Sequence, residues 1–523
     1  MLKVEARDKA KLIDPLYTST RGFWMLLAVL LAVLGWAVYM YIQQLTLGLG
    51  QTGMGRPVYW GVYMVNFIFF IGISHAGTLI SAILRVTGAE WRRPITRVAE
   101  AITAFALIVG TLQIIIDMGR PERLLNAIIY GRLQSPILWD IVSVTAYFMG
   151  SITYLYLPVI PDAALLRDNF PEDGPKWRLR LYTILALGWR GNRTQWIRLE
   201  KVIAVMALLI IPIAVSVHTI ISWILATTVQ PGWHSTIFGP YFVIGAIFSG
   251  IGALFIAMSL LRKNMGLENY FTEKQYRNLG AIFITTAAFW MYFTYSEHLT
   301  LAAGQGIHEF PVLASKLWGP YAPGFWSMVI MMLSAFWILV TPKFMPSEEK
   351  RPRIFHPRIA FGSLGLTIVM ALLISNVLGL PVPDALNPLL WILLFGSLLL
   401  GGLGIATWFK TRFVAASVTS AIFVLISMWL ERWYIIVPTM THPYLVRYAE
   451  YAPSWTEISE TAGSIALFMI MFLVFFKFFP VISIWEVAEG RVLDQEAAKT
   501  GPMPMPEVSS TARKGRLGFR RTE

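Results

Sequence analysis

The sequence predicts an all-α polytopic membrane protein with about twelve transmembrane helices. Hydrophobic residues make up 56% of the chain and charged residues only 14%. Twelve apolar stretches are each about 20 residues or longer, which is enough to cross a bilayer core as a helix. They lie at residues 22–43, 57–84, 98–117, 136–158, 202–229, 239–261, 278–302, 322–342, 359–380, 388–409, 413–438 and 459–478.

Basic residues alternate from one connection to the next. With the N-terminus in the cytoplasm, the inner segments hold 36 of the 43 Lys and Arg residues and the outer loops hold 7. Cytoplasmic loops of membrane proteins carry such an excess, so both termini are expected to be cytoplasmic. The net charge of +13 follows from this topology and from contact with anionic lipid, and no nucleic-acid partner is expected.

The chain contains no cysteine, which excludes iron–sulfur ligation and disulfides within it. Of its seven histidines, His75, His218 and His298 lie in or at the edge of spans. No span carries two histidines at a spacing that suggests a stacked haem pair. We therefore expect no metal or haem to be bound by this chain itself, and any redox metal to sit in other subunits.

An internal duplication at an offset of about 180 residues organises the spans. The stretch 97–117 resembles 277–297, and the span start at 135–140 resembles 322–327. Four spans separate the copies, which predicts a parallel repeat of two four-helix bundles with flanking helices. The expected units are 1–56 (N-terminus and first span), 57–229 (first bundle), 239–342 (three helices of the second bundle), 359–409 (an extra hairpin), 413–478 (the helix completing the second bundle and the final span) and 479–523 (a cytoplasmic tail).

Two carboxylates are expected near the outer ends of adjacent spans. Asp117 ends the third span and is followed one turn later by Arg120, while Asp140 lies just inside the start of the fourth. In a structural interpretation, Asp117 pairs with Arg120 and Asp140 caps a neighbouring helix. In a functional one, the two acids are a catalytic, proton-accepting pair beside a ligand pocket, because acids inside membranes usually serve function.

Deeper ionisable residues suggest a proton pathway. His75 lies roughly 27 Å along its span from the outer end, in the inner half of the bilayer. Glu100, His218 and Glu297 are further candidates. The alternative for a lone membrane histidine is an interhelical hydrogen bond, and the sequence leaves both interpretations open.

Several segments resemble the NrfD/PsrC-type membrane subunits of quinone-linked oxidoreductases, and in particular the ActC-like quinol-oxidising subunit of alternative complex III. The resemblance covers residues 60–245 and 410–480. The matching segments are residues 73–84, 118–121, 135–140, 160–162, 188–193, 216–222, 231–238, 240–243 and 428–432.

The resemblance implies a quinol pocket at the outer side of the first bundle, formed by Asp117, Arg120 and Asp140. Asp140 matches the family's aspartate, whereas Asp117 stands where histidine is common. The implied setting is a respiratory or photosynthetic electron-transfer complex of the bacterial inner (plasma) membrane, with proton translocation as a further implied activity. Menaquinone is the expected quinol, and electrons would pass to extracytoplasmic iron–sulfur and haem c subunits beside other membrane subunits.

The main alternative function is a proton-coupled secondary transporter, because many spans and an internal repeat are equally typical of that class. A transporter usually carries charged residues near the midplane at corresponding places in both halves. Here the best acids lie near the outer face, and Asp140 is replaced by Ser327 in the second copy. A third alternative is a passive membrane anchor, but an anchor would not require ionisable residues such as Asp140 and His75 inside its spans.

Overall fold

The computed structural model describes residues 8–345 and 387–491, together with residues 358, 359, 362, 363, 365–367 and 369 between them. Within this described part all regular structure is helical. Ten of its helices are long and apolar enough to cross a membrane. They are α3 (Arg21–Leu47), α4 (Val62–Val86), α5 (Thr96–Asp117), α7 (Pro136–Asp168), α9 (Arg193–Thr227), α10 (Phe238–Met265), α11 (Glu273–Gly304), α13 (Ala322–Phe344), α16 (Phe413–Thr441) and α17 (Trp455–Phe478).

The prediction of an all-α polytopic membrane protein is confirmed. A further helix, α15 (Asn387–Lys410), covers the predicted span at 388–409. The predicted span at 359–380 falls mostly outside the described residues, as does most of the expected tail at 479–523. Shorter helices are η1 (Lys9–Ile13), α2 (Asp14–Tyr17), η2 (Leu49–Gln51), η3 (Glu90–Arg92), η4 (Pro121–Arg123), α6 (Leu124–Ile129), α8 (Lys176–Leu185) and α12 (Glu309–Leu317).

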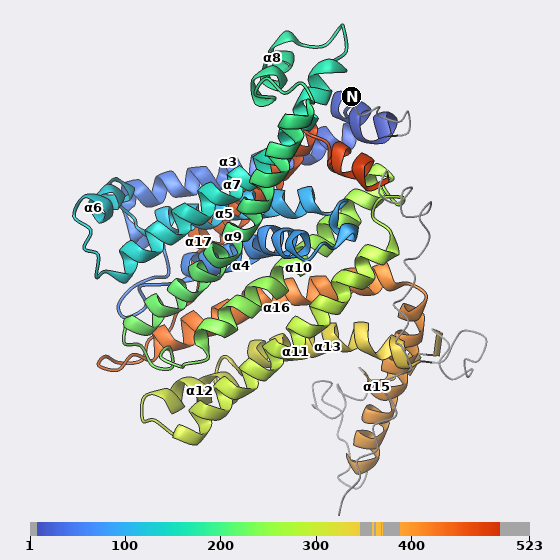
Figure 1. Cartoon of the computed structure of the whole chain (residues 1–523). Helices are drawn as coiled ribbons and strands as arrows, with labels where there is room; N and C mark the ends of the chain where they lie inside the picture. Colours follow the sequence, from blue (N-terminus) through green and yellow to red (C-terminus); the bar gives the residue numbers. More distant parts are fainter. Residues whose placement is uncertain are drawn as a thin grey trace, which may run out of the picture.

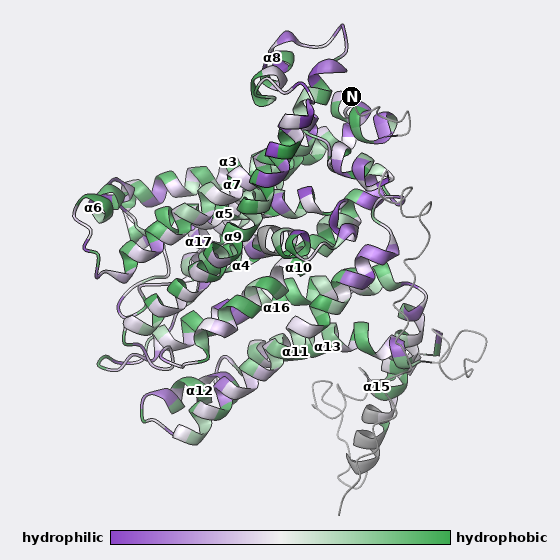
Figure 2. Cartoon of the chain, in the orientation of Figure 1, coloured by the Kyte–Doolittle hydropathy of each residue, from purple (hydrophilic) through white to green (hydrophobic). Residues whose placement is uncertain are grey.

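The long helices lie side by side, and α4, α10 and α16 occupy the middle of the assembly (Figure 1). α4 packs against α5, α9 and α10, and α7 packs against α9. α16 packs against α10 and α13, while α17 packs against α3 and α5. Helix α8, the N-terminus and the segment after α17 lie at one end of the bundle, and α6 and α12 lie at the opposite end. Hydrophilic residues gather at the end that carries α8 (Figure 2).

Helix α7 is longer than the sequence predicted, because it continues past residue 158 to Asp168. Pro158 and Pro161 lie inside this extension and are buried. The carbonyl of Pro158 accepts hydrogen bonds from Arg97 Nη2 and Trp485 Nε1, both at 3.0 Å. Side chains from other segments thus satisfy backbone groups near the prolines, which is how such residues are tolerated within buried membrane helices.

A buried ion pair joins α5 to α7 at their inner ends. Arg97 Nη1 lies 2.5 Å from Asp162 Oδ2, and the two side chains are 1% and 0% exposed. Asp162 also accepts from the backbone N–H groups of Ile484 and Trp485, at 3.3 and 3.4 Å. One carboxylate therefore holds together two helices and the segment that follows the last transmembrane helix.

The topology can be tested with single introduced cysteines, because the chain has none of its own. Ile307, in the connection between α11 and α12, is 85% exposed, and Asp173, between α7 and α8, is exposed as well. The charge asymmetry places the first outside and the second inside. An impermeant thiol reagent added to intact cells should label Ile307→Cys and spare Asp173→Cys. The reverse pattern would invert the whole topology.

Substituting Asp162→Asn should destabilise the protein strongly, because Arg97 would remain buried without a counter-charge. The expected loss is about 3–5 kcal/mol in the free energy of unfolding. Asp168→Asn is the matched control, since Asp168 pairs with Arg167 on the same helix but is 44% exposed; its loss should be at most about 1 kcal/mol. Thermal unfolding of the detergent-solubilised variants measures the difference, and equal shifts would contradict it.

Candidate functional site

Two carboxylates with unpartnered oxygens lie at the outer end of the first bundle. Asp117 is the last residue of α5, where Gly119 with φ 62° ends the helix, and it is partly exposed. Asp140 lies in the second turn of α7 and is 9% exposed. In each of them Oδ1 is buried and has no hydrogen-bond partner in the described structure. Buried polar atoms without a hydrogen-bond partner are rare in folded proteins, and a bound ligand or ion is one explanation for them.

The structure gives Asp117 a different neighbour from the one expected. No ion pair joins it to Arg120 among the described residues, and Arg120 is exposed. Asp117 instead lies close enough to Glu457 of α17 for the two to interact electrostatically. Glu457 is fully buried and accepts hydrogen bonds from Tyr451 Oη at 2.6 Å and from the Gly53 N–H at 2.7 Å.

Asp140 lies apart from this acidic neighbourhood. The structure records no electrostatic interaction of Asp140 with Asp117 or with another charged side chain of the described residues. The expected mutual influence of the two carboxylates is therefore not seen. Their helices α5 and α7 do pack against each other, so both acids border the same outer part of the bundle.

One face of α7 carries polar residues from its outer to its inner end. They follow Asp140 at spacings of three and four residues as far as Tyr154, and Asp162 lies eight residues further, which places them on one side of the helix. From Asp140 to Asp162 this face spans roughly 33 Å along the helix axis. All its members are buried: Asp140, Ser143, Tyr147, Ser151, Tyr154 and Asp162.

The structure brings His75 and His218 together in the interior. Their ring centroids are 3.9 Å apart, and the ring of Tyr147 on α7 lies 4.9 Å from that of His75. Both histidines are 0% exposed. Tyr147 donates to the backbone carbonyl of Ser74 at 3.1 Å. The polar face of α7 therefore meets the histidine pair near the middle of the bundle.

His75 is placed between two acceptors. Its Nδ1 lies 2.9 Å from the carbonyl oxygen of Ile71, and its Nε2 lies 2.5 Å from that of Ala214 on α9. A neutral imidazole carries one N–H and can satisfy only one carbonyl, whereas the imidazolium donates to both. Neither ring nitrogen of the adjacent His218 has a partner in the described residues. The pair thus has the capacity to accept and pass on a proton.

Glu100 lies nearer the inner end, in a cluster of charged groups. Its Oε1 accepts from Ser81 Oγ at 2.9 Å, and Tyr154 Oη lies 3.4 Å from that hydroxyl. Arg85 acts on Glu100 electrostatically and forms an ion pair with Glu486, after α17. Glu100 Oε2 is buried without a partner in the described structure. Glu100 is therefore connected, through Ser81 and Tyr154, to the polar face of α7.

Glu297 does not join these residues. It lies on α11 in the second bundle, where Lys316, His234 and Glu309 are its charged neighbours. The four residues predicted as a proton pathway therefore fall into three places: the central histidine pair, the inner cluster around Glu100, and the second bundle.

Buried charges on α16 and α17 were not assigned to the site by the sequence analysis. Arg432 and Glu431 form an ion pair with a separation of 2.7 Å and are 1% and 2% exposed. Arg432 also lies within electrostatic range of His218. Glu460 on α17 is 2% exposed, and neither carboxylate oxygen has a hydrogen-bond partner in the described residues. The sequence could have indicated these three residues, because each is an ionisable residue inside a predicted span. Which residues they contact is known only from the structure.

The fold and these sites define a multi-pass membrane protein whose helix bundle encloses ionisable side chains from its outer end to its inner end. The family described as polysulphide reductase, NrfD, matches residues 50–380, more than half of the chain. The chain belongs to this family, which confirms the family resemblance at that level; the finer likeness to the alternative complex III protein stays a prediction.

Three relatives show how far the similarity extends. An Hdr-like menaquinol oxidoreductase integral membrane subunit of Archaeoglobus fulgidus is 24% identical over 484 residues, covering 88% of this chain and 94% of that protein. A Halobacterium salinarum protein, provisionally named as a membrane subunit of dimethyl sulfoxide reductase, is 32% identical over 245 residues, or 46% of this chain and 52% of its own. A selenate reductase subunit of Mesobacillus selenatarsenatis is 25% identical over 243 residues, or 44% and 54%. The chain thus spans about half the length of the latter two and nearly all of the first.

Proposed function

We propose that this chain is the quinol-binding membrane subunit of an electron-transfer complex and that it oxidises quinol near the outer face. The observation that carries the proposal is the pair of buried, unpartnered carboxylate oxygens of Asp117 and Asp140 in a protein of the NrfD family. A quinol offers two hydroxyl donors, and these two acids offer the matching acceptors. Membership of this family also favours a role in an oxidoreductase over a proton-coupled transporter.

The relatives support the substrate class and the presence of partner subunits. The relative that matches nearly end to end is named as part of a menaquinol oxidoreductase, and all three are named as subunits of reductases or oxidoreductases. Menaquinol is therefore the proposed substrate. Iron–sulfur and haem c subunits at the outer face, in the manner of alternative complex III, are the proposed electron acceptors, in the bacterial inner membrane.

The surface beside the acids suits a substrate that arrives from lipid. Helix α6 packs against α7 and consists mostly of hydrophobic residues (Figure 2). Leu125, Ile128 and Ile129 are 62%, 58% and 67% exposed. Apolar helices of this kind lie in the membrane interface. A lipid-soluble quinol can approach the carboxylates there without entering the aqueous phase.

The chain's own chemistry is the acceptance of protons. As each quinol O–H bond breaks, a carboxylate oxygen forms the new O–H bond, and the two electrons leave to the outer acceptor. General-base assistance of this kind contributes roughly 10²–10⁴-fold to a rate. The polar face of α7, the His75–His218 pair and Glu100 are the proposed route for protons across the bundle. Glu297 belongs to a different part of the protein and is not included in this route.

Asp140→Asn should reduce quinol oxidation by at least about tenfold, because the amide keeps the shape of the side chain but loses the proton acceptor. Quinol-dependent reduction of the acceptor, measured in membranes with the complex assembled, reports the effect. Glu122→Gln is the matched control, because Glu122 is an exposed carboxylate in the connection between α5 and α7. This substitution should leave the rate of quinol oxidation unchanged. Asp117→Asn should also slow turnover. Wild-type rates in assembled Asp140→Asn membranes would refute the proposed site.

His75→Gln should lower the number of protons transferred per electron while quinol remains bound at the outer face. Glutamine can donate to one of the two carbonyls that His75 faces, but it cannot take up a proton. Proton movement during turnover of the reconstituted complex is the measurement. His308→Gln, at an exposed outer histidine, is the control. Identical proton-to-electron ratios would leave His75 as an interhelical hydrogen bond only, worth about 1 kcal/mol.

A further inference from the structure

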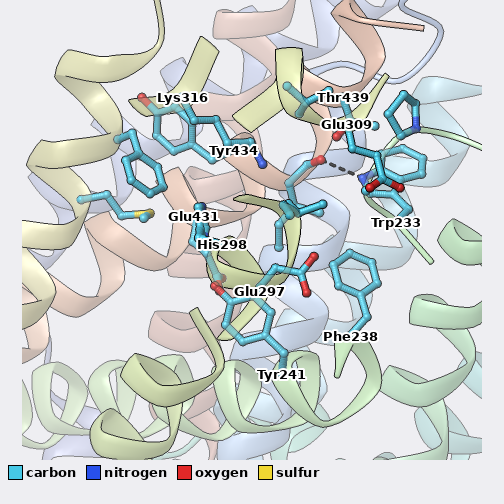
Figure 3. A pocket seen from close by; sticks show the side chains of 17 residues that line it. Trp233, Phe238, Tyr241, Glu297, His298, Glu309, Lys316, Glu431, Tyr434 and Thr439 are labelled. Atoms are coloured by element: carbon cyan, nitrogen blue, oxygen red, sulfur yellow. Dashed lines mark hydrogen bonds between the residues drawn. The ribbon is translucent and has the colours of Figure 1, made fainter. Parts of the chain in front are cut away.

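The second bundle contains a small cavity, lined in part by ionisable side chains, at its outer end and separate from the proposed quinol site. Helices α10, α11, α12, α13 and α16 surround it (Figure 3). Its volume is about 40 Å³, room for about three water molecules. Neither Asp117 nor Asp140 lines it. The ionisable lining residues are Tyr241, Glu297, His298, Glu309, Lys316, Glu431 and Tyr434.

Two of these side chains have buried polar atoms without a hydrogen-bond partner in the described residues. They are Glu297 Oε2 and His298 Nε2. Lys316 forms no ion pair with Glu297 there, although the two interact electrostatically. The Lys316 amine and the Glu297 carboxylate both point into the cavity (Figure 3). A buried water needs two to four polar partners, and this cavity offers them.

The internal repeat relates this cavity to the outer acids of the first bundle. The stretch 97–117 corresponds to 277–297, so Glu297 is the counterpart of Asp117. Each acid lies towards the outer end of its helix, α5 or α11, and a short helix follows in each copy, α6 or α12. The second copy has kept the carboxylate, but it places Lys316 on the short helix beside it.

Buried charges connect the cavity to the centre of the first bundle. Glu431 lines the cavity and pairs with Arg432 at 2.7 Å, while Trp290 Nε1 donates to Glu431 at 2.9 Å. Arg432 in turn acts on His218, whose ring centroid lies 3.9 Å from that of His75. These neighbours form a series of polar and charged groups from the lining residue Glu431 to the histidine pair.

We propose that this cavity is a second proton-exchange site, in which Lys316 and Glu297 share one proton through enclosed water and respond to proton transfer in the first bundle. In the transfer, an N–H bond of the Lys316 ammonium breaks and an O–H bond forms on the Glu297 carboxylate. The charged pair becomes a neutral amine and a neutral acid, and no electrons move. The coupling to quinol oxidation rests on the proposed function, whereas the shared proton does not.

The surroundings of Lys316 determine the pH at which its ammonium group loses a proton. Burial lowers the pKa of Lys316 to about 8, and Glu297 acts in the opposite direction. His298 on α11 and His442 after α16 also face Lys316, and Glu309 lines the cavity from its own helix. The ammonium is therefore held below about pH 8 and lost above it.

Competitive acetylation of the intact protein with acetic anhydride tests the shared proton, because only neutral amines react. Mass spectrometry should find half-maximal reaction of Lys316 near pH 8. Glu297→Gln removes the carboxylate that favours the ammonium, so the midpoint should move to lower pH, while the exposed Lys274 on α11 should not respond. An unreactive Lys316, or a midpoint that Glu297→Gln leaves in place, would overturn the proposal. Wild-type protein supplies the first readout, so it does not depend on the folding of a variant.

Reconstituted complex tests the coupling. Lys316→Gln should lower the proton-to-electron ratio measurably while uncoupled quinol oxidation stays within about twofold of wild type, since Lys316 is outside the proposed quinol site. Lys274→Gln is the control. An unchanged ratio in Lys316→Gln would overturn the coupling. Absence of quinol oxidation in the wild-type complex would instead count against the proposed function, and the acetylation result would still decide whether the proton is shared.

Discussion

The buried ion pair between Arg97 and Asp162 determines where the segment after α17 is placed. An isolated carboxylate in the interior of a membrane protein is very unfavourable, so Asp162 requires both the guanidinium and further donors. The backbone of Ile484 and Trp485 supplies those donors. The segment after α17 is thereby held against the inner end of the first bundle, and α17 itself packs along α3 and α5. Because α17 packs along α3 and α5, Glu457 in its first turn lies near Asp117 at the outer end of the bundle.

Buried polar groups of the bundle are satisfied to different degrees, and the inner end is no exception, because Glu100 Oε2 there also lacks a partner in the described residues. Asp162 at the inner end has both a charge partner and backbone donors. At the outer end and in the centre, Asp117, Asp140 and His218 keep buried atoms without partners in the described structure. A bundle built only for stability would not retain such groups, because each unsatisfied buried polar atom costs about 1–3 kcal/mol. The unsatisfied groups therefore mark where a ligand, a water or a moving proton completes the structure.

The sequence was sufficient for the fold class, because each span must satisfy its own backbone hydrogen bonds in lipid and must be apolar to do so. It also pointed to Asp117, Asp140 and the histidines, since ionisable residues stand out against an apolar background. The sequence did not show which residues face one another. Glu457 lies more than 300 residues from Asp117, and no periodicity within either helix encodes their approach. The predicted end of the fourth span at residue 158 was wrong for a similar reason. The Pro158 carbonyl accepts hydrogen bonds from Arg97 and Trp485, which are distant in the chain, so the helix continues past the prolines.

The internal repeat that the sequence predicts would explain how one architecture can hold the two proposed proton sites. In both copies a carboxylate lies towards the outer end of the second helix, as Asp117 or Glu297. In the first copy the neighbour is another acid, Glu457, so no positive charge compensates the carboxylate that we propose as a proton acceptor. In the second copy the neighbour is Lys316, which compensates the charge and leaves a cavity sized for water. The fourth member of the second bundle, α16, then contributes Arg432 beside His218. The two predicted copies thus differ in the charge next to the corresponding carboxylate, and this difference is what distinguishes the proposed substrate site from the proposed proton-exchange site.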